Sequence, residues 1–244
     1  MSINKVAVRH LGWSLLLMIA VTPGVNAQSQ SPKPAENSPN TTTKKQGLLA
    51  RSVFDLLNMA GTTKANEFRP LNQSERNTLY LRSMKNPLSF ARCLASAGID
   101  QANDKPTEWG QGAEGYGKRF ANILGQYSIQ RTTTYALGSW LHEDNRYFNS
   151  GKRGFWPRTG YAISSGVLAR HDDGTRHFSI SQPVGVAAGA FLARTWLPNS
   201  QNSALDGFES FGITTGSNVA FAVVKEFLPD MVRPLIKKLN GPTN

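Results

Sequence analysis

Three segments in the second half of the chain are dominated by glycine, alanine, serine and threonine. They are GYAISSGVLA at 160–169, VGVAAGAFLA at 184–193 and FGITTGSNVAFAVV at 211–224. Small side chains let helix backbones approach closely, and glycines four residues apart lie on one helix face. Two pairs have this spacing, Gly185 with Gly189 and Gly212 with Gly216. We therefore predict tightly packed helices in these segments.

Apolar residues elsewhere in the chain also recur at helical spacing. Phe120, Ile123, Leu124 and Tyr127 follow one another at steps of three and four, and the pattern repeats further on. It predicts one long helix, or two consecutive ones, from about 114 to 142. A later helix is expected to stop at Pro229, because proline lacks the amide hydrogen that a helix needs. Shorter helices are expected at 49–60, 74–83 and 87–97.

Evidence for strands is thin. The best candidate is a short hairpin near 167–180 with Asp173-Gly174 at its turn, although the same residues suit a helix end followed by a loop. Hydrophobic residues make up 39% of the chain, which is enough for a buried core. The fold class that we expect is mostly α, a compact helical bundle with small-residue-rich helices, formed as a single domain over 48–240.

The N-terminal region has the pattern of a secretory signal peptide over 1–27. Lys5 and Arg9 precede a short apolar run at 11–21, and Val25-Asn26-Ala27 offers small residues for cleavage. The run is shorter than the roughly 20 residues that span a bilayer, which disfavours a retained anchor. Residues 28–47 are polar and rich in proline, and we expect a flexible linker there. Export to the periplasm or cell envelope follows from this interpretation.

The charge balance indicates anionic partners. The chain has 27 basic and 16 acidic residues, a net charge of +11, and loss of Lys5 and Arg9 with the signal would leave +9. An anionic membrane surface or an envelope polyanion fits this charge. Nucleic acid is not expected, because the basic residues are scattered and no recognition motif is present. The single cysteine, Cys93, cannot form an internal disulfide and is expected to be a small buried apolar residue.

A glycine-rich stretch at 110–117, GQGAEGYG, formally contains the pattern GxGxxG before a helix. A dinucleotide-binding loop of this kind follows a buried strand, whereas DKPTE precedes it here. We therefore expect a tight turn packed against Trp109, and no cofactor.

Two clusters of histidine and carboxylate residues are the only weak candidates for catalysis or metal binding. They are His142, Glu143 and Asp144 in the first cluster, and His171, Asp173 and His177 in the second. Imidazoles and carboxylates supply acid/base groups and metal ligands, and the hairpin would bring the last two histidines together. Neither cluster has an established metal-ligand spacing, and such residues often cap helices and populate turns.

Three apolar pairs are followed by proline, at 155–157, 196–198 and 227–229. They are typical of helix boundaries, and an aromatic belt at a membrane surface is the alternative. After Pro229 the sequence alternates apolar residues with Arg233, Lys237 and Lys238. Such a basic amphipathic tail can lie on an anionic surface or cover the end of the bundle.

Four segments carry a resemblance. EWGQGAEGYGKRF at 108–120, LHEDNRYF at 141–148, FWPRTGYA at 155–162 and KEFLPD at 225–230 resemble a family of uncharacterised exported bacterial proteins. The resemblance covers roughly 87–238 and implies a bacterial envelope setting and one continuous domain. It implies no catalytic residue, because no activity is established for the family.

Three interpretations of function remain. The first is a non-catalytic, basic, exported envelope protein that acts by binding or packing and associates with a membrane surface. The second is an exported metal-dependent or acid/base hydrolase that uses the two histidine clusters. The third is a lipid-embedded helical oligomer held together by its small-residue faces.

Overall fold

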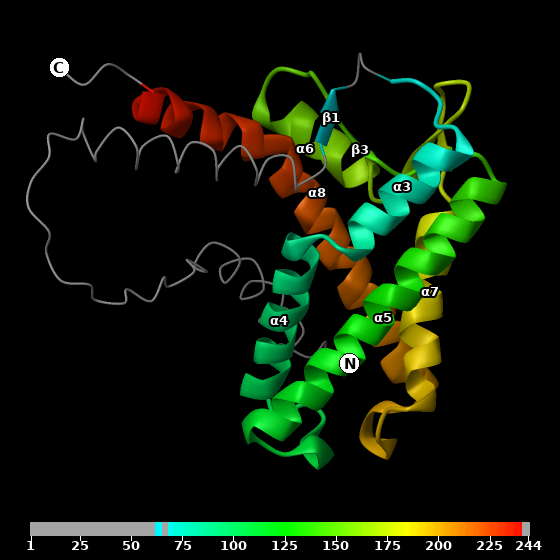
Figure 1. Ribbon diagram of the computed structural model, residues 1–244, viewed down its shortest axis with the longest axis vertical. Coiled ribbons are helices and arrows are strands. Elements are labelled where there is room, and N and C mark those ends of the chain that lie inside the picture. Colours follow the sequence, from blue (N-terminus) through cyan, green and yellow to red (C-terminus); the bar gives the residue numbers. More distant parts are fainter. Residues whose placement is uncertain (1–61, 65–67, 241–244) are drawn as a thin grey trace, which may run out of the picture.

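The computed structural model describes residues 62–64 and 68–240, which form a mostly α-helical bundle (Figure 1). Three predicted features lie outside the described residues: the signal segment at 1–27, the linker at 28–47 and the helix at 49–60. The helices in the described part are α3 (Gln73–Met84), α4 (Pro87–Ala102), α5 (Gly112–Trp140), α6 (Phe155–Ser164), α7 (Ser181–Leu192) and α8 (Ala204–Asn240). The expected fold class is confirmed.

The longest helices form the frame of the molecule. α5 packs against α3, α4 and α7, while α8 packs against α6 and α7. Local sequence explains where several of them begin. Asn72 and Glu75 form a reciprocal capping box at the start of α3, and Asn86 accepts a hydrogen bond from Leu88 N at the start of α4. α5 is the long helix predicted at 114–142, as one continuous element.

The antiparallel contact between α5 and α7 depends on two glycines. A Cβ atom on Gly185 would lie 2.0 Å from Thr134 Oγ1 and 2.8 Å from the backbone oxygen of Gln130. On Gly189 it would lie 2.7 Å from the backbone oxygen of Gln126. Close packing at this pair is therefore confirmed, and α5 covers the face that a dimer would otherwise use. At Gly212 no described atom lies within 4 Å of the Cβ position, so close packing does not require glycine there.

Short strands lie at the end of the bundle where α5 stops. β4 (Leu168–His171) and β5 (Arg176–Phe178) form the predicted antiparallel hairpin, with Gly174 at φ 83° in its turn. β2 (Glu143–Asp144) pairs with β4, so that Glu143 lies opposite His171. A separate parallel pair joins β1 (Thr62–Lys64) to β3 (Tyr147–Asn149). The pattern predicted the hairpin but neither β2 nor the parallel pair, because strands of two or three residues are too short to show periodicity.

The expectation that the last helix stops at Pro229 is wrong. α8 continues through Pro229 and Pro234, and its last turns project beyond the other helices (Figure 1). Arg158 donates a hydrogen bond of 2.5 Å to the backbone oxygen of Glu226, in the turn that precedes Pro229. This side-chain contact ties α8 to α6 one turn before Pro229. Within the described ranges, no helix is long and apolar enough to cross a membrane.

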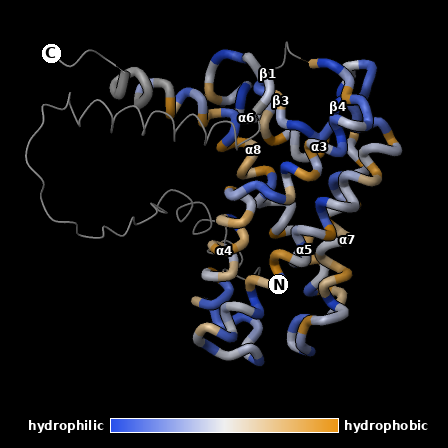
Figure 2. The backbone as a smooth tube through the Cα atoms, viewed as in Figure 1, coloured by the Kyte–Doolittle hydropathy of each residue, from blue (hydrophilic) through white to orange (hydrophobic). Residues whose placement is uncertain are grey.

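The interior contains many small residues and hydrogen-bonded polar groups beside a few large side chains such as those of Phe148 and Leu197. Ala97, Ala162 and Ala193 are fully buried, and the largest fully buried side chains are those of Arg119 and Glu226. Hydrophobic residues follow α4, α7 and α8, whereas hydrophilic residues gather around β4 (Figure 2). Polar contacts therefore help to position the elements.

Candidate anion-binding cavity

The first predicted cluster has a structural role in the fold. Glu143 is buried and accepts hydrogen bonds from both the backbone and the hydroxyl of Ser181, from Ile180 N and from Ser179 Oγ. Burial raises the pKa of Glu143, but these hydrogen bonds outweigh it and hold the pKa below its usual value. Asp144 is also buried and pairs with Arg146. Glu143 thus fixes the start of α7 to the end of α5, and Asp144 orients the following arginine.

Only the two histidines of the second cluster lie close together. The hairpin brings the rings of His171 and His177 to a centroid distance of 5.2 Å, as the sequence suggested. Asp173 instead accepts hydrogen bonds from Thr175 within the turn, which lower its pKa. His142, the histidine of the first cluster, is exposed and has a φ of 56° just after α5 ends. Among the described residues, no three histidine, cysteine or acidic side chains are placed to hold a metal ion together.

The glycine-rich loop surrounds an arginine side chain. Gly110 and Gly112 have φ values of 63° and 88°, and the loop directs backbone oxygens at Arg119. The Arg119 guanidinium donates to the backbone oxygens of Lys105, Pro106 and Gly110 and to the side chains of Gln101 and Asp104. Because carbonyl oxygens point into the loop, it suits a cation and cannot bind a phosphate.

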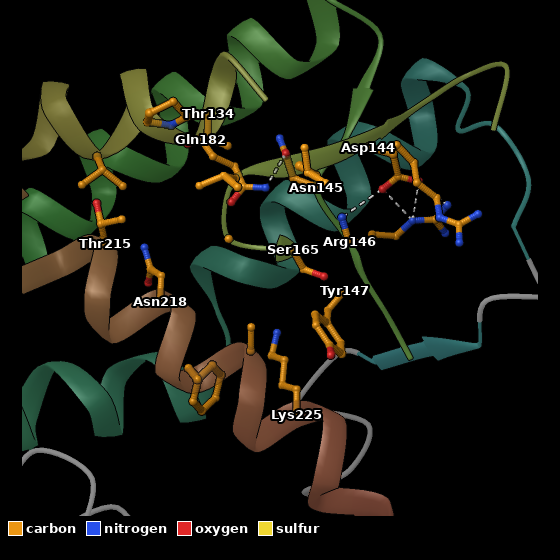
Figure 3. Close-up of a pocket in the computed structure, with 18 of the residues that line it drawn as sticks. Thr134, Asp144, Asn145, Arg146, Tyr147, Ser165, Gln182, Thr215, Asn218 and Lys225 are labelled. Atoms are coloured by element: carbon orange, nitrogen blue, oxygen red, sulfur yellow. Dashed lines mark hydrogen bonds and ion pairs between the residues drawn. The ribbon is translucent and has the colours of Figure 1, made fainter. Parts of the chain in front are cut away.

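A cavity of about 370 Å³ lies between α5, α7 and α8, beside the strands (Figure 3). None of the three histidines discussed above is among its lining residues. α4 contributes Arg92, α5 contributes Arg131 and α8 contributes Lys225. The close-up shows Lys225 extending from α8 toward Ser165 and Tyr147. Three positively charged side chains from three helices therefore converge on this cavity.

These cations lie against aromatic rings rather than beside carboxylates. The Arg92 guanidinium lies 4.5 Å and the Lys225 ammonium 5.3 Å from the centroid of the Phe221 ring. Arg131 lies 5.3 Å from the centroid of Tyr127. Within the part of the chain that the structure describes, no carboxylate forms an ion pair with any of the three. Arg131 Nε is buried with no described hydrogen-bond partner.

The electrostatics of the cavity follow from this shortage of acidic groups. Burial, followed by the positive charges of Arg131 and Arg92, lowers the pKa of Lys225 to about 7. Burial and the charge of Arg131 also lower the pKa of Arg92. Both effects have the sign expected when like charges are crowded in a poorly solvated space. An anion bound here would relieve the repulsion.

Other lining groups extend the polar surface of the cavity. Arg170 Nε and Thr215 Oγ1 are buried with no described hydrogen-bond partner. Asn218 lies beside Thr215 on α8, and Thr134 faces them from α5 (Figure 3). The one lining carboxylate, Asp144, is engaged by Arg146. The cavity thus has unused donors and positive charge, and its only acid is already neutralised.

Sequence reasoning missed all three central cations. A usable signal was present, because Arg92 lies in the apolar run LSFARCLA and Lys225 in FAVVKEFL. A charged residue inside an apolar helix is seldom buried without a partner. Periodicity alone does not show that these positions on separate helices face one another.

No family model, curated protein or solved structure matches the chain.

Proposed function

We propose that this protein is an exported, basic binding protein whose cavity takes a small anionic ligand. The export signal predicted at 1–27 and the net positive charge support an envelope setting. The cavity provides the binding site, and the ligand class is a carboxylate, sulfate or phosphate group on a small body. A volume of about 370 Å³ lies within the usual range of small-molecule sites.

One observation carries this proposal: Arg92, Arg131 and Lys225 line the cavity without a described carboxylate partner. All three side chains are half-buried, and cations withdrawn from water are normally paired because a charge loses hydration on burial. A bound anion would supply the missing partner. Guanidinium groups are suited to this role because their N–H donors match the geometry of carboxylate and phosphate oxygens.

The test is an NMR titration of the purified full chain with sulfate, with sodium chloride at equal ionic strength as the control. We expect saturable shifts at residues that line the cavity, and weaker binding in Arg92→Met and Arg131→Met. Arg82→Met is the matched control, because it removes the same charge from an exposed position on α3. Equal sulfate affinity in all of these variants would overturn the proposal.

A second candidate function, docking on an anionic lipid surface, is favoured by the loop and helix end at 152–156. Trp156 is 78% exposed and lies beside exposed Phe155, whose ring stacks on Phe227. Lys152 and Arg153 are exposed next to this pair. Aromatic side chains beside basic ones suit the boundary between lipid headgroups and acyl chains.

Vesicle flotation tests the docking site. We expect the protein to bind vesicles that contain phosphatidylglycerol and to leave them when salt is raised, because surface attraction is screened. Trp156→Ala should weaken binding, whereas Trp140→Ala removes an equally exposed tryptophan, 75% exposed, from the end of α5. Equal losses in the two variants, or binding indifferent to lipid charge, would count against docking through α6.

A further inference from the structure

Lys225 differs from the other cations of the cavity because its amine can act as a nucleophile. Its side chain projects from α8 into the cavity, with the amine directed toward Ser165 (Figure 3). Arg92 lies over the same Phe221 ring as Lys225, and Arg131 enters from α5. The amine therefore shares the cavity with two guanidinium groups that cannot lose their protons under ordinary conditions.

These surroundings favour the neutral amine. Burial and the two neighbouring guanidinium charges lower the pKa of Lys225 to about 7, so an appreciable share of the amine is unprotonated near neutral pH. Lysines made nucleophilic in this way, by desolvation and a nearby cation, form imines with carbonyl compounds. The exposed Lys118 pairs with Glu114 on the surface of α5 and lacks these conditions.

We propose that the anion bound in the cavity is an oxo acid, and that Lys225 Nζ forms an imine with its carbonyl carbon. This inference rests on the proposed function, since Arg92 and Arg131 would hold the carboxylate of the ligand. Binding the carboxylate places the adjacent carbonyl within the same small cavity as the amine. Proximity of this kind converts a slow encounter into an efficient reaction.

The reaction is balanced without a further reactant. The nitrogen lone pair forms a bond to the carbonyl carbon, and the C=O π electrons move to oxygen to give a carbinolamine. The carbon–oxygen bond then breaks as the C=N bond forms. The oxygen leaves as water with the two hydrogens of the amine, and water reverses the sequence by hydrolysis. The step is a reversible condensation in which nothing is oxidised or reduced.

Reductive trapping tests the inference. The purified full chain is incubated with glyoxylate and cyanoborohydride, which reduces an imine to a stable carboxymethyl amine, and labelled lysines are identified by peptide mass spectrometry. We expect Lys225 to be labelled at least roughly tenfold faster than Lys118, because a far larger share of its amine is neutral at pH 7. Propanal, which has the carbonyl without the carboxylate, should lower that ratio.

Variants separate this inference from the proposed function. Lys225→Arg should remove the label, because a guanidinium does not form an imine, and Lys118→Arg should leave labelling of Lys225 unchanged. Equal labelling of Lys225 and Lys118, in a protein that binds sulfate, would overturn the assignment of Lys225 as the imine-forming residue. The proposed function would remain. A ratio that is the same for propanal and glyoxylate would overturn the oxo-acid assignment. Failure to bind sulfate would overturn the proposed function itself.

Discussion

Two arginines on α5 show how differently the fold treats the same side chain. Arg119 is 0% exposed and donates to three backbone oxygens, one amide and one carboxylate. Arg131, further along the helix, lies against an aromatic ring, and its Nε has no described partner. The first guanidinium is satisfied by its own loop and stabilises structure. The second guanidinium, that of Arg131, has an N–H donor without a described partner, and an anionic ligand can accept from it.

The largest effect that we predict is on stability, at Arg119. Arg119→Met would leave three backbone oxygens of the surrounding loop without their donor, and we expect a loss of about 3–5 kcal/mol in the free energy of unfolding. Urea denaturation followed by circular dichroism measures it. Sulfate affinity at low denaturant should stay the same, and a stable Arg119→Met protein would remove the contrast between the two arginines.

For Arg131 we predict the reverse: sulfate affinity falls and stability does not. Arg131→Met should weaken sulfate binding at least about tenfold, since a hydrogen bond to a charged group contributes roughly 1.5–3 kcal/mol. Its unfolding free energy should be unchanged or higher, because the substitution removes repulsion with Lys225 and Arg92. Destabilisation as large as that of Arg119→Met would mean that Arg131 is structural too.

Sequence patterns predicted one of these environments better than the other. Gly110 and Gly115 lie close to Arg119 in sequence, so a tight glycine turn was predictable, although the buried cation at its centre was not. Most of the helices, the hairpin and the close packing at Gly185 and Gly189 follow from local periodicity and spacing. The helix expected over 160–169 is wrong in its second half, because α6 ends at Ser164 and β4 begins at Leu168. By contrast, the cavity depends on the relative rotation of α4, α5 and α8, which no local pattern specifies. No local pattern predicted that α8 continues through Pro229 and Pro234, either.

The pH dependence of sulfate binding sharpens the contrast further. Sulfate keeps its charge between pH 6 and 9, so the change in affinity reports the protein alone. With Lys225 near pKa 7 in the free protein, binding above that pH requires proton uptake at the amine. Affinity should fall by up to about tenfold per pH unit above 7, and the fall should vanish in Lys225→Met. Guanidinium groups as a class do not lose their protons in this pH range, so the slope reports the amine.

The stability of the free protein should rise with pH, whereas its sulfate affinity falls. A fully hydrated lysine, as in the unfolded chain, has a pKa of 10.5, and the fold lowers the pKa of Lys225 to about 7. Between these values the unfolded state binds more protons, so the contribution of Lys225 to stability rises with pH through this window. It is least favourable below pH 7, where folding buries a charged amine. Urea midpoints at pH 6 and 9 should therefore converge in Lys225→Met.

The smallest effect tests which of the Arg119 contacts matters. Asp104 is the only carboxylate that pairs with Arg119 in the described residues, at 3.2 Å, and its side chain is 46% exposed. An exposed partner is well hydrated and contributes little, so Asp104→Asn should cost within about 1 kcal/mol of unfolding free energy. The asparagine oxygen can still accept from Arg119 and from Gln111, which also donates to Asp104. Urea denaturation of Asp104→Asn and Arg119→Met, measured side by side, compares the two losses in unfolding free energy. A loss as large as that of Arg119→Met would show that a carboxylate, rather than the loop carbonyls, satisfies this arginine, and that the two arginines of α5 differ in ion pairing alone.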